Sequence, residues 1–209
     1  MVGTHTPCGR YTEAMMTVEM TQRPLEQSIT VEEFDALPVD TSHRYEIENG
    51  LLLVNARPAP PHSRVMKRLA MQLDSQLPSG WEAFPEIEAE LSGRSPRRVP
   101  DLVVAPVEVD EQTRVRSEQI VLAIEIVSSV ESAIRDYAIK AGEYAANKIA
   151  NYWVIDIVNT DSVGLTIFTL DTTGEYHITP RATGVVTVES PCPLTIDLDA
   201  LTGRRVVEG

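Results

Sequence analysis

The sequence predicts an α/β fold, in which a mixed β-sheet is flanked by helices and followed by extra C-terminal strands. Two near-continuous apolar runs, residues 120–127 and 152–158, are typical of strands covered on both faces. An amphipathic segment, residues 62–77, precedes the first run, and a second segment of helical period, residues 131–148, separates the two. Short strand-like segments then follow, so we expect an α+β arrangement around one mixed sheet.

Length and composition limit the class of protein. The chain has 209 residues, of which 43% are apolar, so it suits one large domain and excludes wholesale disorder. Residues 1–27 show no clear period, and we expect a disordered tail there, ahead of a single domain at 28–209. No apolar run approaches the roughly 20 residues that cross a bilayer, so we expect no membrane partner. Two cysteines, Cys8 and Cys192, are too few for a disulfide framework, which favours a reducing cytoplasm.

A short helix and a hairpin open the predicted domain. Thr30 and Glu33 have the spacing of a capping box, so we expect a helix that begins there and ends before the next proline. Asn-Gly is the strongest short hairpin signal, because both turn residues must accept positive φ. Two strand-like runs flank Asn49-Gly50, at residues 44–48 and 51–54.

The middle of the chain alternates helices and strands. Val65, Leu69 and Leu73 recur every four residues, which predicts one face of a helix. Residues 86–91 alternate strictly and predict a strand with one wet face, and residues 99–105 predict another strand that begins near a proline. Residues 106–118 are polar, and we expect a loop there.

A second helix and several strands complete the prediction. Residues 131–148 follow two serines suited to capping, with an expected apolar stripe of Ile134, Ala138, Ala141 and Ala145. A short helix is expected near Asp199. Three further segments predict strands: residues 165–170, 176–179 and 185–188.

Two carboxylates interrupt the apolar strands. Glu125 breaks the run at 120–127, and Asp101 directly precedes four apolar residues. If the two strands are neighbours, the carboxylates converge, and a divalent cation such as Mg²⁺ would relieve their repulsion. A structural arrangement is equally open, with Glu125 paired to an Arg or Lys and Asp101 capping a turn.

Lys140 lies off the expected apolar stripe of its helix. Asp136 precedes it by four residues, so one interpretation is a surface ion pair worth about 0.3–0.5 kcal/mol. The other interpretation is a cation directed at a phosphate or an attacking water.

Six motifs in order resemble the Uma-type family of restriction-endonuclease-like proteins, a bacterial branch of the PD-(D/E)XK nuclease superfamily. They extend over residues 28 to 202, and each is weak alone. They are the hairpin segment Arg44-Tyr45-Glu46-Ile47-Glu48-Asn49-Gly50, the helix start Pro60-Pro61-His62, the strand Pro100-Asp101-Leu102-Val103-Val104, the strand Ile124-Glu125-Ile126-Val127-Ser128, the helix positions Asp136, Lys140 and Tyr144, and the strand Tyr152-Trp153-Val154-Ile155-Asp156.

The resemblance implies a restriction-endonuclease-like core and a catalytic site. Asp101 and Glu125 would be Mg²⁺ ligands, with Mn²⁺ able to substitute, and Glu46 would be a further acid near the metal. The superfamily pattern places a lysine two residues after the Glu, where this chain has Val127. The resemblance implies that Lys140 replaces that lysine from the following helix. The implied activity is Mg²⁺-dependent endonucleolytic hydrolysis of DNA.

A DNA partner must be reconciled with the charge. Acidic residues number 31 and basic residues 18, for a net charge of −13, which argues against binding of nucleic acid by charge alone. Residues 57–98 hold seven basic and five acidic residues, so a basic strip on an acidic body is open. The substrate contacts we expect are His62, Arg64, Lys67 and Arg68. A homodimer is a further expectation, because enzymes that cut both strands often pair subunits across the DNA two-fold axis.

Two other functions stay open at this point. Val127 and the net charge of −13 favour a catalytically inactive nuclease-like module that binds or regulates. The third hypothesis is an acidic metal-binding protein without a nucleic-acid partner.

Overall fold

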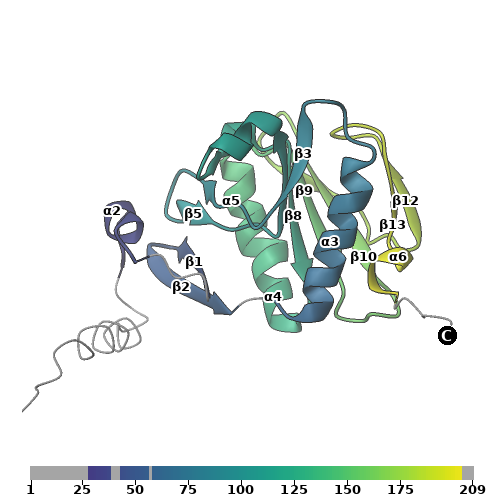
Figure 1. Cartoon of the computed structure of the whole chain (residues 1–209), viewed down its shortest axis with the longest axis horizontal. Coiled ribbons are helices and arrows are strands. Elements are labelled where there is room, and N and C mark those ends of the chain that lie inside the picture. The colour runs from purple at the N-terminus through teal and green to yellow at the C-terminus, as the bar shows by residue number, and fades with distance from the viewer. Residues whose placement is uncertain (1–27, 39–42, 57, 204–209) are drawn as a thin grey trace, which may run out of the picture.

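The larger sheet is mixed and forms the centre of the computed structural model, which describes residues 28–38, 43–56 and 58–203 (Figure 1). Strands β8 and β9 are parallel, and the other neighbouring pairs are antiparallel. The predicted fold class is confirmed. Within the described residues the strand order is β11 (Tyr176–Ile178), β10 (Gly164–Leu170), β9 (Asn151–Asp156), β8 (Leu122–Val127), β6 (Leu102–Pro106) and β3 (Trp81–Pro85).

Helices cover both faces of this sheet. On one face, helix α3 (Pro60–Asp74) packs Val65, Leu69 and Leu73 against a core that includes Ile124 of β8. On the other face lies a continuous helical segment that includes Tyr144, which packs against Val127 and Tyr152. Its parts are α4 (Val130–Ile134), the π-helical turn η3 (Arg135–Lys140) and α5 (Ala141–Ala146). Strand β8 is buried over its whole length, as its apolar run predicts.

A second, smaller sheet carries the hairpin, which Figure 1 shows beside the main body. Asn49 and Gly50 have φ values of 52° and 80°, so the turn has the geometry that Asn-Gly predicts. Helix α2 (Val31–Asp35) begins with the predicted capping box between Thr30 and Glu33. The strand order of this sheet is β2 (Leu51–Ala56), β1 (His43–Glu48), β5 (Arg97–Arg98), β4 (Ala89–Glu90) and β7 (Val115–Arg116).

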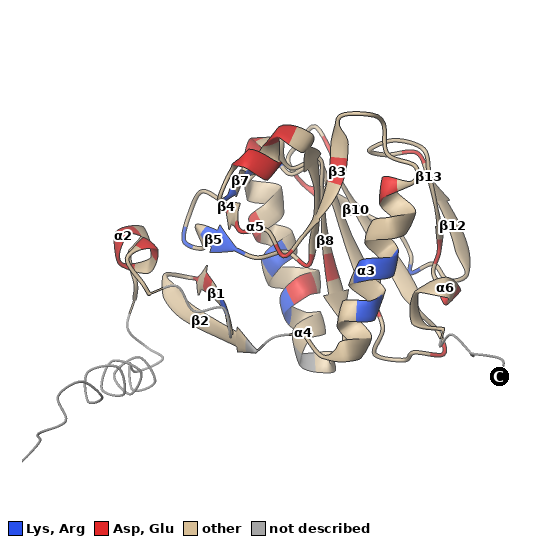
Figure 2. Ribbon diagram, in the orientation of Figure 1, with Lys and Arg blue, Asp and Glu red and all other residues tan. Residues whose placement is uncertain are grey.

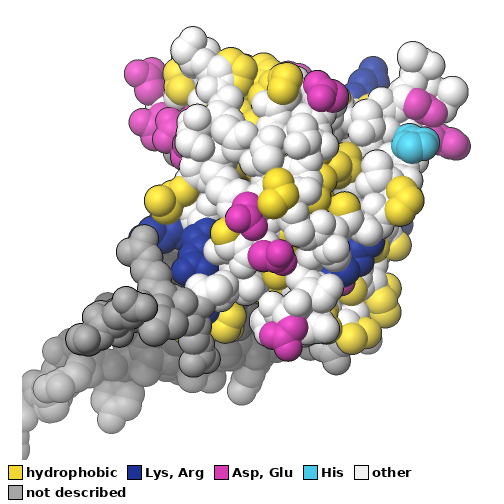
Figure 3. Space-filling model, turned by 90° about the vertical axis from the view of Figure 1, so that its right-hand side faces the viewer, with side chains coloured by type: hydrophobic (Ala, Val, Ile, Leu, Met, Phe, Trp, Pro, Cys, Tyr) yellow, Lys and Arg dark blue, Asp and Glu magenta, His cyan; other side chains and the backbone are white. Residues whose placement is uncertain are grey.

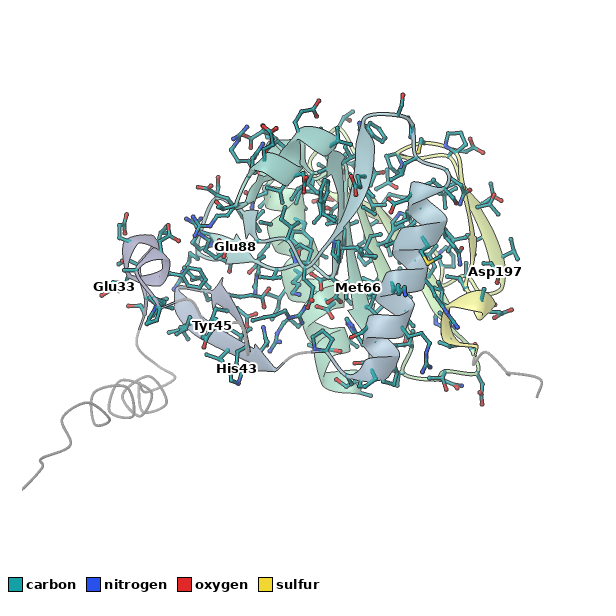
Figure 4. The ribbon with its side chains drawn as sticks, in the orientation of Figure 1. Glu33, His43, Tyr45, Met66, Glu88 and Asp197 are labelled. Carbon is teal, nitrogen blue, oxygen red and sulfur yellow. The ribbon has the colours of Figure 1, made fainter. Side chains whose placement is uncertain are left out.

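The C-terminal end forms a hairpin and a short helix beside α3: β12 (Val185–Val188), β13 (Leu194–Asp197) and α6 (Asp199–Thr202). Two glutamine side chains of α3 hold this hairpin. Gln72 accepts from the backbone N–H of Asp197 at 2.8 Å and donates to its carbonyl at 3.0 Å, and Gln76 pairs with Thr195 in the same way. In Figure 4, Asp197 and Glu33 lie at opposite ends of the molecule, with Met66 of α3 between them.

Three local predictions were wrong in part. Of the strand predicted at 86–91, only Ala89–Glu90 is extended, as β4 of the smaller sheet, because Glu86 has a φ of 51° and ends the extended backbone that follows β3. The loop predicted at 106–118 contains two 3₁₀ turns, η1 (Val107–Glu111) and η2 (Ser117–Gln119), and the strand β7.

Of the apolar stripe predicted for the second long helix, Ala141 is buried in the core and the stripe as a whole does not face it. Ile134 is 68% exposed and Ala138 is exposed, whereas Asp136, Lys140 and Tyr144 are buried. The π-helical turn adds residues to one turn, and so it rotates the buried face away from the one that a regular α-helical period gives.

The tail expected at 1–27, which includes Cys8, lies outside the described residues. Within the part of the chain that is described, no helix has both the length and the apolarity needed to cross a membrane.

Candidate metal and phosphate site

The register of two neighbouring strands brings Asp101 and Glu125 together. Strand β6 is antiparallel to β8 with Leu102 opposite Ile124, so the next position in this register sets Asp101 opposite Glu125. The Oδ2 atom of Asp101 accepts a hydrogen bond from the backbone N–H of Ile126 at 2.7 Å. Both carboxylates are 3% exposed. Their strands are therefore neighbours, which is the condition under which the sequence predicts convergence.

The second long helix supplies a buried cation to Glu125. Lys140 Nζ lies 2.8 Å from Glu125 Oε1 and 3.4 Å from Asp136 Oδ1. The hydroxyl of Tyr144 donates to the same Oε1 atom at 2.8 Å. The ion pair with Asp136 that the sequence indicated is present. Lys140 is 6% exposed, however, so the pair is buried and not on the surface. The Lys partner that the structural alternative gave Glu125 is also present.

Glu46 reaches the same region from strand β1. Its Oε1 accepts from the backbone N–H of Val99 at 2.8 Å, and its Oε2 accepts from the Asn55 side chain at 2.7 Å. Burial raises the pKa of Glu46, but Lys140 and Arg98 outweigh that effect and lower it below the usual value. Glu46 is therefore held as a carboxylate by neighbours from three other segments.

Two cationic or polar side chains contact Asp101. His62, at the start of α3, lies with Nε2 3.0 Å from Asp101 Oδ2, and Arg44 of β1 donates from Nη1 to Asp101 Oδ1 at 2.9 Å. Arg44 was missed from the sequence. A signal existed, since Arg44 and Glu46 are two residues apart on one strand and so share a face.

The two central carboxyls titrate in opposite directions. Burial raises the pKa of Asp101. The hydrogen bond and charge of His62, together with the charges of Lys140 and Arg44, outweigh burial and lower the pKa to about 2. At Glu125, burial is the largest effect and outweighs the attraction of Lys140, while Asp101 adds a like charge, so the pKa is raised to about 8. Burial lowers the pKa of Lys140, but Glu125 and the other nearby carboxylates raise it well above the usual value.

These side chains line one cavity of about 230 Å³. Its walls come from the hairpin, the start of α3, the ends of β6 and β8, and the helical segment after β8. The polar and charged residues among its lining are Arg44, Glu46, Asn55, His62, Asp101, Glu125, Ser128, Ser132, Arg135, Asp136 and Lys140.

The other residues expected to contact substrate lie elsewhere on α3. Arg64 and Lys67 are exposed, and neither lines the cavity. Arg68 donates from Nη1 to the carbonyl oxygens of three residues in and after α6, at 2.6–3.0 Å: Ala200, Leu201 and Gly203. Their role in substrate binding stays a prediction.

The basic residues of β5 are not available as a binding strip. Arg98 is fully buried, and its Nε and Nη2 atoms each donate to the Glu143 carboxylate at 2.7 Å. Arg97 is 3% exposed and pairs with Asp35. Figure 2 shows basic residues on β5, α3 and the helical segment that ends with α5. On the face drawn in Figure 3, basic side chains form only small separate groups among acidic and apolar ones.

The cavity supplies fewer protein ligands than a complete Mg²⁺ coordination shell needs. Among the described residues, no group of three or more His, Cys, Asp and Glu side chains is arranged to hold a metal ion. Mg²⁺ usually keeps several waters and is bound through one or two carboxylates with substrate phosphate, so Asp101 and Glu125 stay the predicted ligands. Both hydrogen-bonding partners of Glu125 use Oε1, which leaves Oε2 without one among the described residues.

Comparisons with known proteins identify the family. Residues 31–200 match the family described as "Uma2: Putative restriction endonuclease". The chain belongs to the Uma2 family. A solved structure described as a "putative nuclease belonging to DUF820" from Anabaena variabilis is similar to this Uma2 protein, with a TM-score of 0.60 and 19% identity. The match covers 83% of this chain and 99% of that one, and at this identity it shows a shared fold. A sequence search among curated proteins finds no match.

Proposed function

We propose that this Uma2 protein is a Mg²⁺-dependent endonuclease that hydrolyses DNA phosphodiester bonds, with Mn²⁺ able to replace Mg²⁺. The observation that supports it is the meeting of Asp101, Glu125 and Lys140 in one cavity, from two neighbouring strands and the helix after them. Family membership supports the same class of reaction.

Asp101 and Glu125 would hold the cation, which supplies Lewis-acid activation of water and charge stabilisation at phosphate. The low pKa of Asp101 keeps it ionised at neutral pH, so it is ready as a ligand. Burial raises the pKa of Glu125, and the positive charge of a bound cation would favour the ionised form that ligates it. Lys140 stays charged and would stabilise negative charge that develops on the phosphate.

The remaining polar residues would position these groups. Tyr144 and Lys140 both contact Oε1 of Glu125 and thereby fix the orientation of its carboxylate. Glu46 adds a further negative charge beside Lys140, and His62 would contact a phosphate oxygen or assist proton transfer from its place on Asp101.

A second candidate function, an inactive nuclease-like binding module, has one observation in its favour. Asp101 contacts Arg44 and His62, and Glu125 contacts Lys140, so the two carboxylates have protein partners. An ion-paired cluster of this kind also serves a purely structural role.

Plasmid cleavage separates the two functions. Supercoiled DNA is incubated with Mg²⁺ or Mn²⁺ and wild-type protein, Asp101→Asn, Lys140→Met or the exposed control Glu82→Gln. We expect nicked and linear products from the wild type and the control, and a loss of about 100-fold or more in the other two. Equal cleavage by all four proteins, or cleavage without a divalent cation, contradicts the proposal. No cleavage by any of them supports the inactive module.

The other predictions from the sequence stay open. A homodimer across the DNA, a cytoplasmic location and a single domain at residues 28–209 are proposals, and sedimentation of the purified chain tests the first of them.

A further inference from the structure

Arg44 uses only part of its guanidinium group. Its Nη1 atom donates to Asp101 Oδ1 at 2.9 Å and lies 3.4 Å from Glu86 Oε1. Its Nε atom is buried and has no hydrogen-bond partner among the described residues. A guanidinium carries five N–H donors in a rigid fork, and both of these contacts use Nη1.

The contact with Asp101 places a positive charge against the oxygen that a cation would need. Asp101 Oδ2 already accepts from Ile126 N–H at 2.7 Å and lies 3.0 Å from His62 Nε2. Asp101 Oδ1 has Arg44 as its one hydrogen-bond partner within residues 28–38, 43–56 and 58–203. A divalent cation that binds Asp101 through Oδ1 would therefore lie next to the Arg44 guanidinium. The two positive charges would repel each other strongly at that distance.

We propose that Arg44 neutralises Asp101 while no divalent cation is bound, and binds a phosphate oxygen of the substrate once a cation displaces it. This inference rests on the proposed nuclease function. The guanidinium fork matches phosphate in a bidentate way, which an ammonium cannot do. The side chain of Arg44 is 23% exposed against 8% for Lys140, so Arg44 is the more accessible of the two cations.

The direction in which cation affinity changes when Arg44 loses its charge separates this role from a structural one. If Arg44 competes with the cation for Asp101, removal of its charge raises cation affinity. If Arg44 only orients Asp101 for ligation, removal lowers that affinity. Because both roles lower DNA cleavage, cleavage alone does not distinguish them.

The test is calorimetric titration of the full chain with Mn²⁺ in the absence of DNA. The variants are Arg44→Gln, Arg44→Lys and Arg135→Gln, whose side chain lines the same cavity but contacts Glu48 at 3.4 Å rather than Asp101. Arg135→Gln measures the effect of losing one positive charge near the cavity. Circular dichroism and a thermal melt establish that each variant is folded.

We expect Arg44→Gln to bind Mn²⁺ about fivefold or more tightly than Arg135→Gln does, the lower end of typical coupling between two sites. Arg44→Lys should stay near the wild-type affinity, because it keeps the charge. Plasmid cleavage by both Arg44 variants should fall, by about 100-fold for Arg44→Gln.

Two results overturn the inference. One is a Mn²⁺ affinity of Arg44→Gln at or below that of Arg135→Gln. The other is a rise in Mn²⁺ affinity of Arg44→Lys as large as that of Arg44→Gln, which would show that charge is not the cause. The proposed function fails in a different way. Wild-type protein that binds Mn²⁺, gains affinity in Arg44→Gln and cuts no DNA would support the competition at Asp101 and contradict the nuclease.

Discussion

At the residue scale, the unusual feature is a lysine whose ammonium is buried between carboxylates. Lys140 contacts Glu125 at 2.8 Å and Asp136 at 3.4 Å, and all three side chains are at most 8% exposed. Loss of one partner from a buried ion pair leaves an uncompensated charge, whereas replacement of both partners is often close to neutral. The cluster should therefore show strong coupling in stability as well as in catalysis.

Lys140→Met is expected to lower the free energy of unfolding by about 3–5 kcal/mol, because Glu125 and Asp136 lose their cation. The double variant Lys140→Met/Glu125→Gln should lose less than the sum of the single variants, by about 1–3 kcal/mol. Urea denaturation of the four proteins measures this cycle. Lys67→Met, at an exposed position of α3, is the control and should change stability by less than about 0.5 kcal/mol. Additive losses would contradict a direct interaction between Lys140 and Glu125.

The raised pKa of Glu125 predicts the pH dependence of stability. Its folded pKa is about 8 against an ordinary value of 4.5, so the folded state binds more protons than the unfolded state between these pH values. Stability contributed by this residue is therefore lost as pH rises through that window, at up to about 1.4 kcal/mol per pH unit. Wild type should lose stability relative to Glu125→Gln between about pH 5 and pH 8 in thermal melts. A constant difference would mean that Glu125 is ionised beside Lys140 throughout.

Sequence reasoning found the central acids but not their surroundings. Asp101 and Glu125 stand out because a carboxylate in an apolar strand needs a partner. Arg44 does not stand out, because an arginine on a short strand is ordinary until the fold sets it on Asp101. Arg98 falls within residues 57–98, where a basic strip stayed open, yet Glu143, 45 positions away, pairs with it in the interior. Contacts at such separations follow from topology rather than from local pattern.

At the element scale, the hairpin between β1 and β2 carries Arg44 and Glu46 into the site. Its turn depends on Gly50, which has a φ of 80° with open space where a Cβ would lie. The register pairs Glu46 with Leu53, so a slip of the hairpin would move Glu46 to the other face. The turn residues are thus coupled to the chemistry through strand register.

Gly50→Ala should lower the free energy of unfolding by about 1–2 kcal/mol, because an L-residue is strained at this positive φ. Gly142→Ala is the matched control in α5, where a Cβ also meets open space. That substitution should stabilise the protein by about 0.4–1 kcal/mol through lower entropy of the unfolded chain. Urea midpoints with unchanged slopes would measure both changes. The same sign for the two variants would contradict the turn assignment.

The helix after β8 shows why the inward face of an element was mispredicted. A stripe of alanines and an isoleucine fits a regular period of 3.6 residues, and that period was assumed over the whole segment. The π-helical turn at Arg135–Lys140 changes the period in the middle. The helix then buries Asp136, Lys140 and Tyr144, which are the residues of its matched family motif. A binary apolar pattern does not report such a turn, and the buried polar positions were marked by the family motif alone.

At the scale of the whole molecule, the C-terminal hairpin and α6 share one core with α3 and the larger sheet. Leu201 of α6 and Leu69 of α3 are both fully buried in this core. The order of helices and strands predicted the fold class but not the packing of the C-terminal hairpin on α3. The glutamine contacts between α3 and β13 have no local sequence signal. The shared core supports the proposal that residues 28–209 form one domain.

Leu201→Ala should lower the free energy of unfolding by about 2–5 kcal/mol, the cost of a cavity at a fully buried leucine. If the C-terminal hairpin belongs to the same domain, the variant should still unfold in one transition. Far-ultraviolet circular dichroism and tryptophan fluorescence, which includes buried Trp153, should then give one midpoint. Two separate midpoints would show that the hairpin unfolds by itself.

The central claim is that Asp101 and Glu125 form one cation site. The most direct measurement is calorimetric titration with Mn²⁺ of wild type, Asp101→Asn, Glu125→Gln and the exposed control Glu82→Gln. We predict saturable binding by the wild type and the control, and its loss in both site variants. Unchanged binding in Asp101→Asn and Glu125→Gln would place the metal elsewhere and contradict the claim.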